Sequence, residues 1–201
     1  MNENKLVYSQ KVIEFATVAV ETCLFLEKTT ENTKEDFISK AIKILPLLYL
    51  KTDLLDLDKT DDYFDIERFV TEDDYLFVKN QIESLLGSDD SFLEVFHPDM
   101  PYSDTPIAAF ISENLADIYQ ELKDFAANFQ LEQEEIMTAA VYHSAESFSE
   151  HWGQKLLNAL RALHALRHSD TFGYNDEDDS FDVSNHGKTD RDSFLRFLNE
   201  D

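Results

Sequence analysis

The sequence predicts an all-α protein, a helical bundle of about five principal helices that includes one long antiparallel hairpin. Apolar residues recur at three- and four-residue steps through residues 105–130 and again through 141–167, which places each set on one face of a helix. The connection near Gln130 is short, so the two helices are expected to pack antiparallel. The chain of 201 residues has four Gly and four Pro, which favours long helices over an all-β fold.

The two stripes of the hairpin use large apolar side chains. The first contains Ile107, Ile111, Leu115, Ile118, Leu122, Phe125 and Phe129, and the second contains Val141, Ala145, Phe148, Trp152, Leu156, Ala159, Leu163 and Leu166. Thr105 followed by Pro106 is typical of a helix start, so the first helix of the hairpin is expected to begin there.

The first half of the chain predicts three further helices. One covers about residues 5–28, and a second begins after Thr33. Pro46 lies inside the second, where it predicts a kink or an early end. A third begins at Thr71, whose following acidic residues complement the helix dipole, and Gly87 fits the position just after its end.

The composition divides the chain into two parts. Residues 1–168 are expected to form a single helical-bundle domain. Residues 169–201 carry ten acidic and three basic side chains and predict a mobile, partly disordered acidic tail, with a short helix at 190–198.

The formal charge of −25 bears on partners and location. Such a field repels nucleic acid and anionic membrane surfaces and attracts basic proteins. Cys23 is the only cysteine, so an intrachain disulfide is excluded, and no apolar run reaches the ~20 residues of a membrane span. We therefore expect a cytoplasmic protein that binds protein, with a homodimer as one form of such binding, and we expect no cofactor.

A metal-binding bundle is the weaker of the chemical hypotheses. Its candidates are Glu113 and Asp117 on the first hairpin helix and His143 and Glu146 on the second, where antiparallel packing puts Asp117 and His143 at one height. Counting ~100° per residue turns these side chains, and Asp124 with them, away from the apolar stripes. A solvated face is therefore the favoured interpretation.

A small-ligand or enzyme site is the stronger alternative. Lys155 breaks the apolar stripe beside Trp152, and the loop from Phe96 to Asp104 could complete a pocket. The favoured interpretation of Lys155 is structural, with Asp104 as its partner. The remaining candidate ligand-binding residues are Asp99, Arg161 and His164.

The second hairpin helix also contains a gap in the acidity. No acidic residue occurs between Glu150 and Asp170, whereas Lys155, Arg161 and His164 lie there. In so negative a chain this is the anion-binding surface that the sequence favours, and the acidic tail of the protein is one candidate occupant. The other interpretation is that these cations complement the end of their helix.

Several segments resemble an uncharacterised bacterial family, a domain of unknown function of about this length. They are residues 94–104 (EVFHPDMPYSD), 111–125 (ISENLADIYQELKDF), 152–156 (WGQKL) and 159–164 (ALRALH). The resemblance covers most of residues 6–167 and implies an all-helical cytoplasmic protein. It carries no activity, cofactor or catalytic residue that could be transferred to this chain.

The leading hypothesis of function is a non-enzymatic interaction or regulatory protein. It follows from the weakness of every catalytic motif and from the large negative charge. Whether the chain catalyses a reaction, which ligand it takes and which partner it binds are not encoded in any motif found here.

Overall fold

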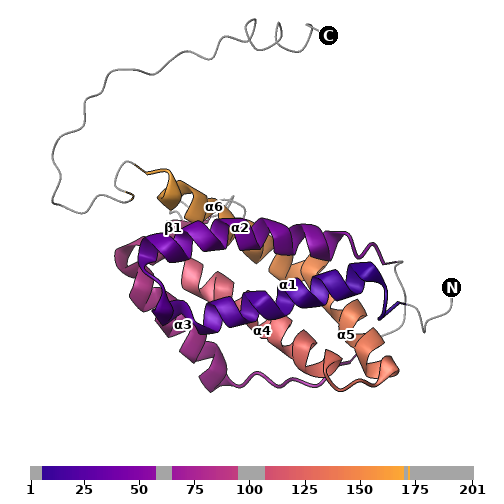
Figure 1. Cartoon of the computed structure of the whole chain (residues 1–201). Coiled ribbons are helices and arrows are strands. Elements are labelled where there is room, and N and C mark those ends of the chain that lie inside the picture. The colour runs from indigo at the N-terminus through magenta and orange to yellow at the C-terminus, as the bar shows by residue number, and fades with distance from the viewer. Residues whose placement is uncertain (1–5, 58–64, 95–106, 170–171, 173–201) are drawn as a thin grey trace, which may run out of the picture.

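The computed structural model describes residues 6–57, 65–94, 107–169 and 172 (Figure 1). Three of its helices begin at a side-chain cap. Ser9 caps α1 (Gln10–Glu27) and Thr33 caps α2 (Lys34–Asp53), each accepting a hydrogen bond from a backbone N–H of the first turn. Thr71 begins α3 (Glu72–Leu86) with a full capping box that uses Asp74. The starts predicted after Thr33 and at Thr71 are confirmed.

Pro46 lies inside α2 without ending it, and Gly87 ends α3. The helix α2 continues past Pro46 to Asp53, so the early end predicted there is wrong. Pro46 is exposed, and the buried Leu45, Leu48 and Thr52 hold the helix together around the lost hydrogen bond. Gly87 ends α3 with a positive φ of 59°, as predicted from its position.

The hairpin consists of α4 (Ile111–Phe129) and a long helix interrupted by a π-helical turn. The second arm runs as α5 (Glu134–Ser147), the π-turn η5 (Phe148–Trp152) and α6 (Gly153–Arg167). The chain reverses at Gln130 and Leu131, which confirms the predicted connection. With this arm taken as one element, the expected bundle of about five principal helices is confirmed.

The start predicted for the first hairpin helix at Thr105 is wrong. Residues Ala108–Phe110 form strand β2, which pairs antiparallel with β1 (Ser91–Leu93), and α4 begins only at Ile111. The cap comes from another segment, since the buried carboxylate of Asp90 accepts the Ser112 N–H at 2.7 Å and its hydroxyl at 2.7 Å. Asp90 belongs to the short η3 turn (Gly87–Asp90).

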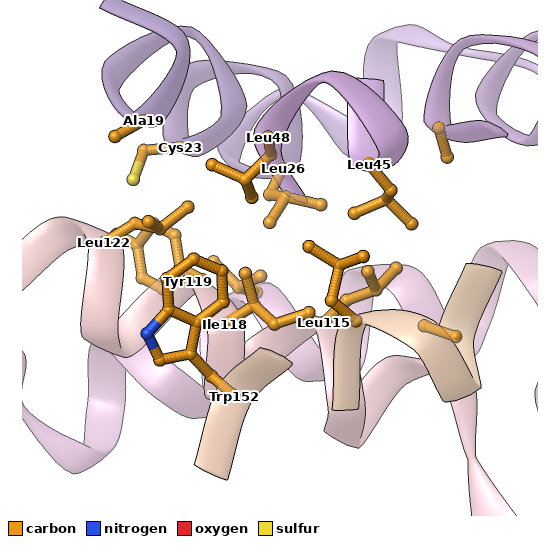
Figure 2. Packing of buried hydrophobic residues seen from close by; sticks show 14 of the residues in the cluster. Ala19, Cys23, Leu26, Leu45, Leu48, Leu115, Ile118, Tyr119, Leu122 and Trp152 are labelled. Carbon is orange, nitrogen blue, oxygen red and sulfur yellow. The ribbon is translucent and has the colours of Figure 1, made fainter. Parts of the chain in front are cut away.

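Helix α4 is the centre of the bundle. It contacts α1, α3, α5 and α6, and α2 completes the assembly by packing on α1 and α6 (Figure 1). In Figure 2, Leu26, Leu45 and Leu48 of α1 and α2 point toward Leu115 and Ile118 of α4 and toward Trp152. Apart from Ser169 and Phe172, the predicted acidic tail with its short helix at 190–198 lies outside the described residues.

Cys23 lies within this core and provides a chemical test of the packing. Burial raises the pKa of its thiol to about 12, so neither the thiolate nor access for a reagent is present at neutral pH. We expect iodoacetamide to modify native protein at least ~10³-fold more slowly than protein in concentrated urea, because modification requires unfolding. Mass spectrometry of timed samples measures both rates. Equal rates in the two conditions would contradict the packing of α1.

Candidate functional site

A row of polar side chains runs along one face of the central helix. Its members, which we call the polar ridge, recur three or four residues apart and are Asn114, Asp117, Glu121, Asp124 and Asn128. The face that carries them is covered by α3, by α5 and α6 and by residues 65–70. The ridge is thus a polar seam between packed elements, buried at Asp124 and Asn128 and partly open to water at Asp117 and Glu121.

Asp124 lies at the buried part of the ridge. Its side chain is 0% exposed, and its Oδ1 accepts the backbone N–H groups of Phe69 at 2.7 Å and Val70 at 2.9 Å. The prediction that Asp124 points to water is therefore wrong. The angular position of Asp124 around its helix shows only that it lies away from the apolar stripe. It cannot show that residues 65–70, which are distant in sequence, cover that face.

Asn128 holds the same segment one turn further along α4. Its Oδ1 accepts the Glu67 N–H at 3.2 Å, and its Nδ2 donates to the Glu67 carbonyl oxygen at 2.8 Å. A side-chain amide that both donates to and accepts from one residue mimics a strand pairing. Asp124 and Asn128 together therefore fix the backbone of residues 67–70 and, with it, the position where α3 begins.

Arg68 projects from this segment over the ridge. Its Nη1 lies 3.3 Å from both Glu121 Oε1 and Asp124 Oδ2, and its Nη2 lies 3.3 Å from His143 Nε2. Partial burial by itself lowers the pKa of Arg68, but the carboxylates of Glu121 and Asp124 outweigh it and raise that pKa. The guanidinium occupies the position between carboxylates and imidazole that a cation would take.

The other end of the ridge contains Asp117, bridged by two side chains. Tyr75 of α3 donates its hydroxyl to Asp117 Oδ1 at 3.0 Å, and the Lys155 ammonium of α6 donates to Oδ2. Burial, followed by the nearby Asp117 carboxylate, raises the pKa of Tyr75, so this hydroxyl stays a proton donor. Lys155 is 42% exposed and Asp117 28%, so this pair is accessible to water.

The candidates for a small-ligand site do not share one surface. Trp152 is 1% exposed, and its indole Nε1 donates to the Ser144 carbonyl oxygen at 3.2 Å. Arg161 and His164 are exposed on α6. Asp99, Asp104 and the loop of residues 96–104 lie outside the described residues, and the described partner of Lys155 is Asp117.

The candidates for a metal site are likewise separated. Asp117 pairs with Lys155, His143 faces Arg68, and Glu146 is exposed. Glu113 is half exposed and lies 4.0 Å from Lys79. Over the described ranges, no group of three or more His, Cys, Asp or Glu side chains is placed to hold a metal ion.

A second cluster of a carboxylate, a phenol and a lysine, partly buried, joins α1 to α4. Glu27 accepts the Tyr119 hydroxyl at 2.9 Å and the Lys123 ammonium at 2.7 Å on the same Oε1. Burial, and then the bond to Glu27, raises the pKa of Tyr119. This cluster resembles Tyr75–Asp117–Lys155 in chemistry, since a carboxylate is held by one phenol and one lysine in both.

Arg68, Asn128 and Ser147 were not predicted as members of the site, although Ser147 donates to Glu121 Oε2 at 2.8 Å. For Asn128 the signal was the regular spacing of polar residues along 114–128, which equals that of the apolar stripe on the same helix. When apolar residues on one face of a helix and polar residues on another both recur at the helical period, other segments are expected to cover both faces. This pattern in residues 111–129 therefore indicated a helix at the centre of the bundle.

Fold and site together define an all-α bundle in which a central helix carries an apolar face and an internally paired polar face. The chain belongs to the family described as Domain of unknown function (DUF5063), which matches residues 6–169. It is also similar to the crystal structure of protein BF1032 from Bacteroides fragilis, with 39% sequence identity, a TM-score of 0.72 and coverage of 82% of this chain and 96% of that one. Comparison with curated proteins finds no match.

Proposed function

We propose that this protein acts by binding another protein through the outer face of α1, without catalysis. The observation that carries the proposal is a second apolar stripe on α1, formed by Ile13, Thr17, Val20 and Leu24 and called here the outer stripe. Ile13 is 50%, Val20 36% and Leu24 41% exposed. Solvent-facing apolar groups in such an array are typical of protein-binding surfaces.

The spacing of the outer stripe fits a helical partner. Its members recur at four, three and four residues, which is the repeat by which one helix packs along another. The Thr17 hydroxyl donates to the Ile13 carbonyl oxygen at 2.8 Å, so its methyl group is left for packing. The opposite face of α1 carries Val12, Phe15, Ala19, Cys23 and Leu26 in the core. Helix α1 therefore needs only one of its two apolar faces to fold.

Charge indicates which helix would bind. At ~100° per residue, the exposed Glu21 flanks the outer stripe on one side, and Glu27, which already pairs with Lys123, flanks it on the other. The whole chain carries a formal charge of −25, so a second copy would be repelled. The proposed partner is therefore an amphipathic helix with an apolar stripe and basic flanks.

The paired state of the polar ridge supports a binding function over catalysis. Asp117, Glu121 and Asp124 each contact a lysine or an arginine of this chain. The proposal places the protein in the cytoplasm, supported by its single buried cysteine, which is typical of reducing compartments. None of the helices described is long and apolar enough to cross a membrane.

A defined peptide tests this proposal. The probe is a synthetic fluorescent helix with leucines three and four residues apart and lysine flanks, titrated with the full chain by fluorescence anisotropy. We expect Val20→Glu with Leu24→Glu to weaken binding by about tenfold or more, because the apolar contact is lost. The control Leu47→Glu with Leu54→Glu alters two leucines of similar exposure, one in α2 and one just after its end, and is expected to leave affinity within about twofold.

Whether the α1 variant binds the peptide more weakly or more tightly distinguishes apolar contact from simple charge attraction. Both double variants make the chain more acidic, so attraction alone would tighten binding of a basic peptide. Tighter or unchanged binding by the α1 variant contradicts the proposal. A wild-type dimer in light scattering that becomes monomeric in the α1 variant also contradicts it, by assigning the outer stripe to a second copy.

A further inference from the structure

Helix α6 differs in charge from every other helix of the described chain. Each of α1 to α5 contains acidic residues, whereas Gly153–Arg167 contains none. Its solvent-exposed side chains form one stripe, the α6 face, which consists of Gln154, Leu157, Arg161, His164, Ala165 and His168. In a chain of formal charge −25, this face attracts anions where the other helices repel them.

The α6 face combines one formal cation, Arg161, and two imidazoles with an exposed apolar side chain. Leu157 is 41% exposed, one turn before the exposed Arg161. The imidazoles of His164 and His168 lie 4.5 Å apart between centroids, on the same side of the helix. A ligand with several carboxylates and an aromatic or aliphatic side chain matches this arrangement.

The chain folds back on itself just after α6. Ser169 donates its N–H to the Leu166 carbonyl oxygen, and Phe172 donates its N–H to that of Ser169. The Phe172 ring lies 4.6 Å below the Arg167 guanidinium and packs against the core cluster. The residues that follow therefore start beside α6 and not at a point beyond its end.

Those residues have the composition that the α6 face requires. Five of the seven residues from 176 to 182 are acidic, none is basic, and Phe181 lies among them. A stretch of seven residues with random-coil dimensions spans ~15 Å on average, and α6 is ~22 Å long. The acidic segment therefore reaches the middle of α6 without strain.

We propose that residues 176–182 bind the α6 face of the same chain, with carboxylates on Arg161, His164 and His168 and Phe181 against Leu157. Because the segment is tethered, its effective concentration at the face is in the millimolar range. The tail thus acts as a built-in competitor that excludes weak acidic ligands from α6. This inference concerns a different helix from the outer stripe and does not depend on the proposed function.

Paramagnetic labelling of the full chain tests the contact. Ser180→Cys takes a nitroxide while the buried Cys23 does not, and amide signals are recorded by NMR. At about 0.05 M salt we expect signals of α6 to broaden and those of α1 to stay sharp, and at about 0.5 M salt we expect the broadening to be lost. Sharp α6 signals at low salt, or broadening spread over all helices, would overturn the proposal.

Two matched variants isolate the α6 face. Arg161→Glu with His164→Glu and His168→Glu is expected to abolish the broadening. Lys11→Glu with Lys28→Glu changes the formal charge equally, at exposed positions of α1, and is expected to preserve it. Broadening that survives the α6 variant contradicts the proposal. Broadening of unlabelled ¹⁵N protein by labelled ¹⁴N protein also contradicts it, by assigning the contact to another molecule's tail.

Discussion

Replacing Asp124 with alanine is expected to lower the free energy of unfolding by about 2–4 kcal/mol, because its carboxylate holds residues 67–70 against α4. The carboxylate is fully buried and accepts two backbone N–H groups as well as contacting Arg68. Without it, the Phe69 and Val70 amides have no acceptor, and each pays the cost of desolvation. Urea unfolding followed by the emission of Trp152, the single tryptophan, measures the change.

Asp117 provides the control for this prediction. It also belongs to the polar ridge and also pairs with a cation, but water reaches it, and Lys155 can turn to solvent when it is removed. Asp117→Ala is therefore expected to cost about 1 kcal/mol or less. A loss below about 1 kcal/mol in Asp124→Ala, or equal losses in the two variants, would show that the segment of residues 67–70 is not held through the ridge.

Replacing Gly153 with alanine is expected to destabilise the protein by about 1–3 kcal/mol, against the usual helix preference of alanine. A Cβ there would lie 2.5 Å from the Phe148 carbonyl oxygen and 3.0 Å from two carbons of the Phe148 ring. The carbonyl is backbone of the π-turn and accepts the Gly153 N–H, so it cannot move aside without breaking that bond. Denaturant unfolding and the emission of Trp152 report the effect.

The sign of this second result is decisive, because alanine in an ordinary helix interior stabilises by about 1 kcal/mol relative to glycine. A stabilised Gly153→Ala protein would mean that residues 148–153 form a regular α-helix. Gln154→Ala, at the exposed neighbouring position, is the matched control and is expected to stay within about 0.5 kcal/mol of wild type.

A carbonyl oxygen just before the π-turn is the hydrogen-bond partner of Trp152. The Ser144 carbonyl accepts the Phe148 backbone N–H and keeps a second lone pair for another donor. The indole N–H of Trp152 bonds to the Ser144 carbonyl oxygen, so a large buried side chain finds its partner within its own helix. Its ring also packs at 4.7 Å from Phe148.

Local chemistry made the helix ends predictable from the sequence. Thr33 and Thr71 as N-caps and Gly87 as the terminating residue each depend on neighbours within four positions. The turn near Gln130 follows from a break in one apolar pattern. These features need no knowledge of what packs against them.

Contacts between distant segments set the remaining features. Asp90 caps α4 from another turn, so the sequence around Thr105 could not reveal where the helix begins. The three-residue strands β1 and β2 have no periodicity long enough to detect. Asp124 was placed on the correct side of its helix, but what covers that side comes from residues 67–70, more than fifty positions away.

The order of helices along the chain has a consequence for synthesis. Helix α4, against which α1 and α3 pack, is made after both of them, and the contact between Glu27 and Tyr119 spans 92 positions. In a nascent chain, the apolar faces by which α1 and α3 pack on α4 therefore stay uncovered until residue 129 has left the ribosome. Chaperones that shield apolar surface have the longest opportunity to act on this first half of the chain.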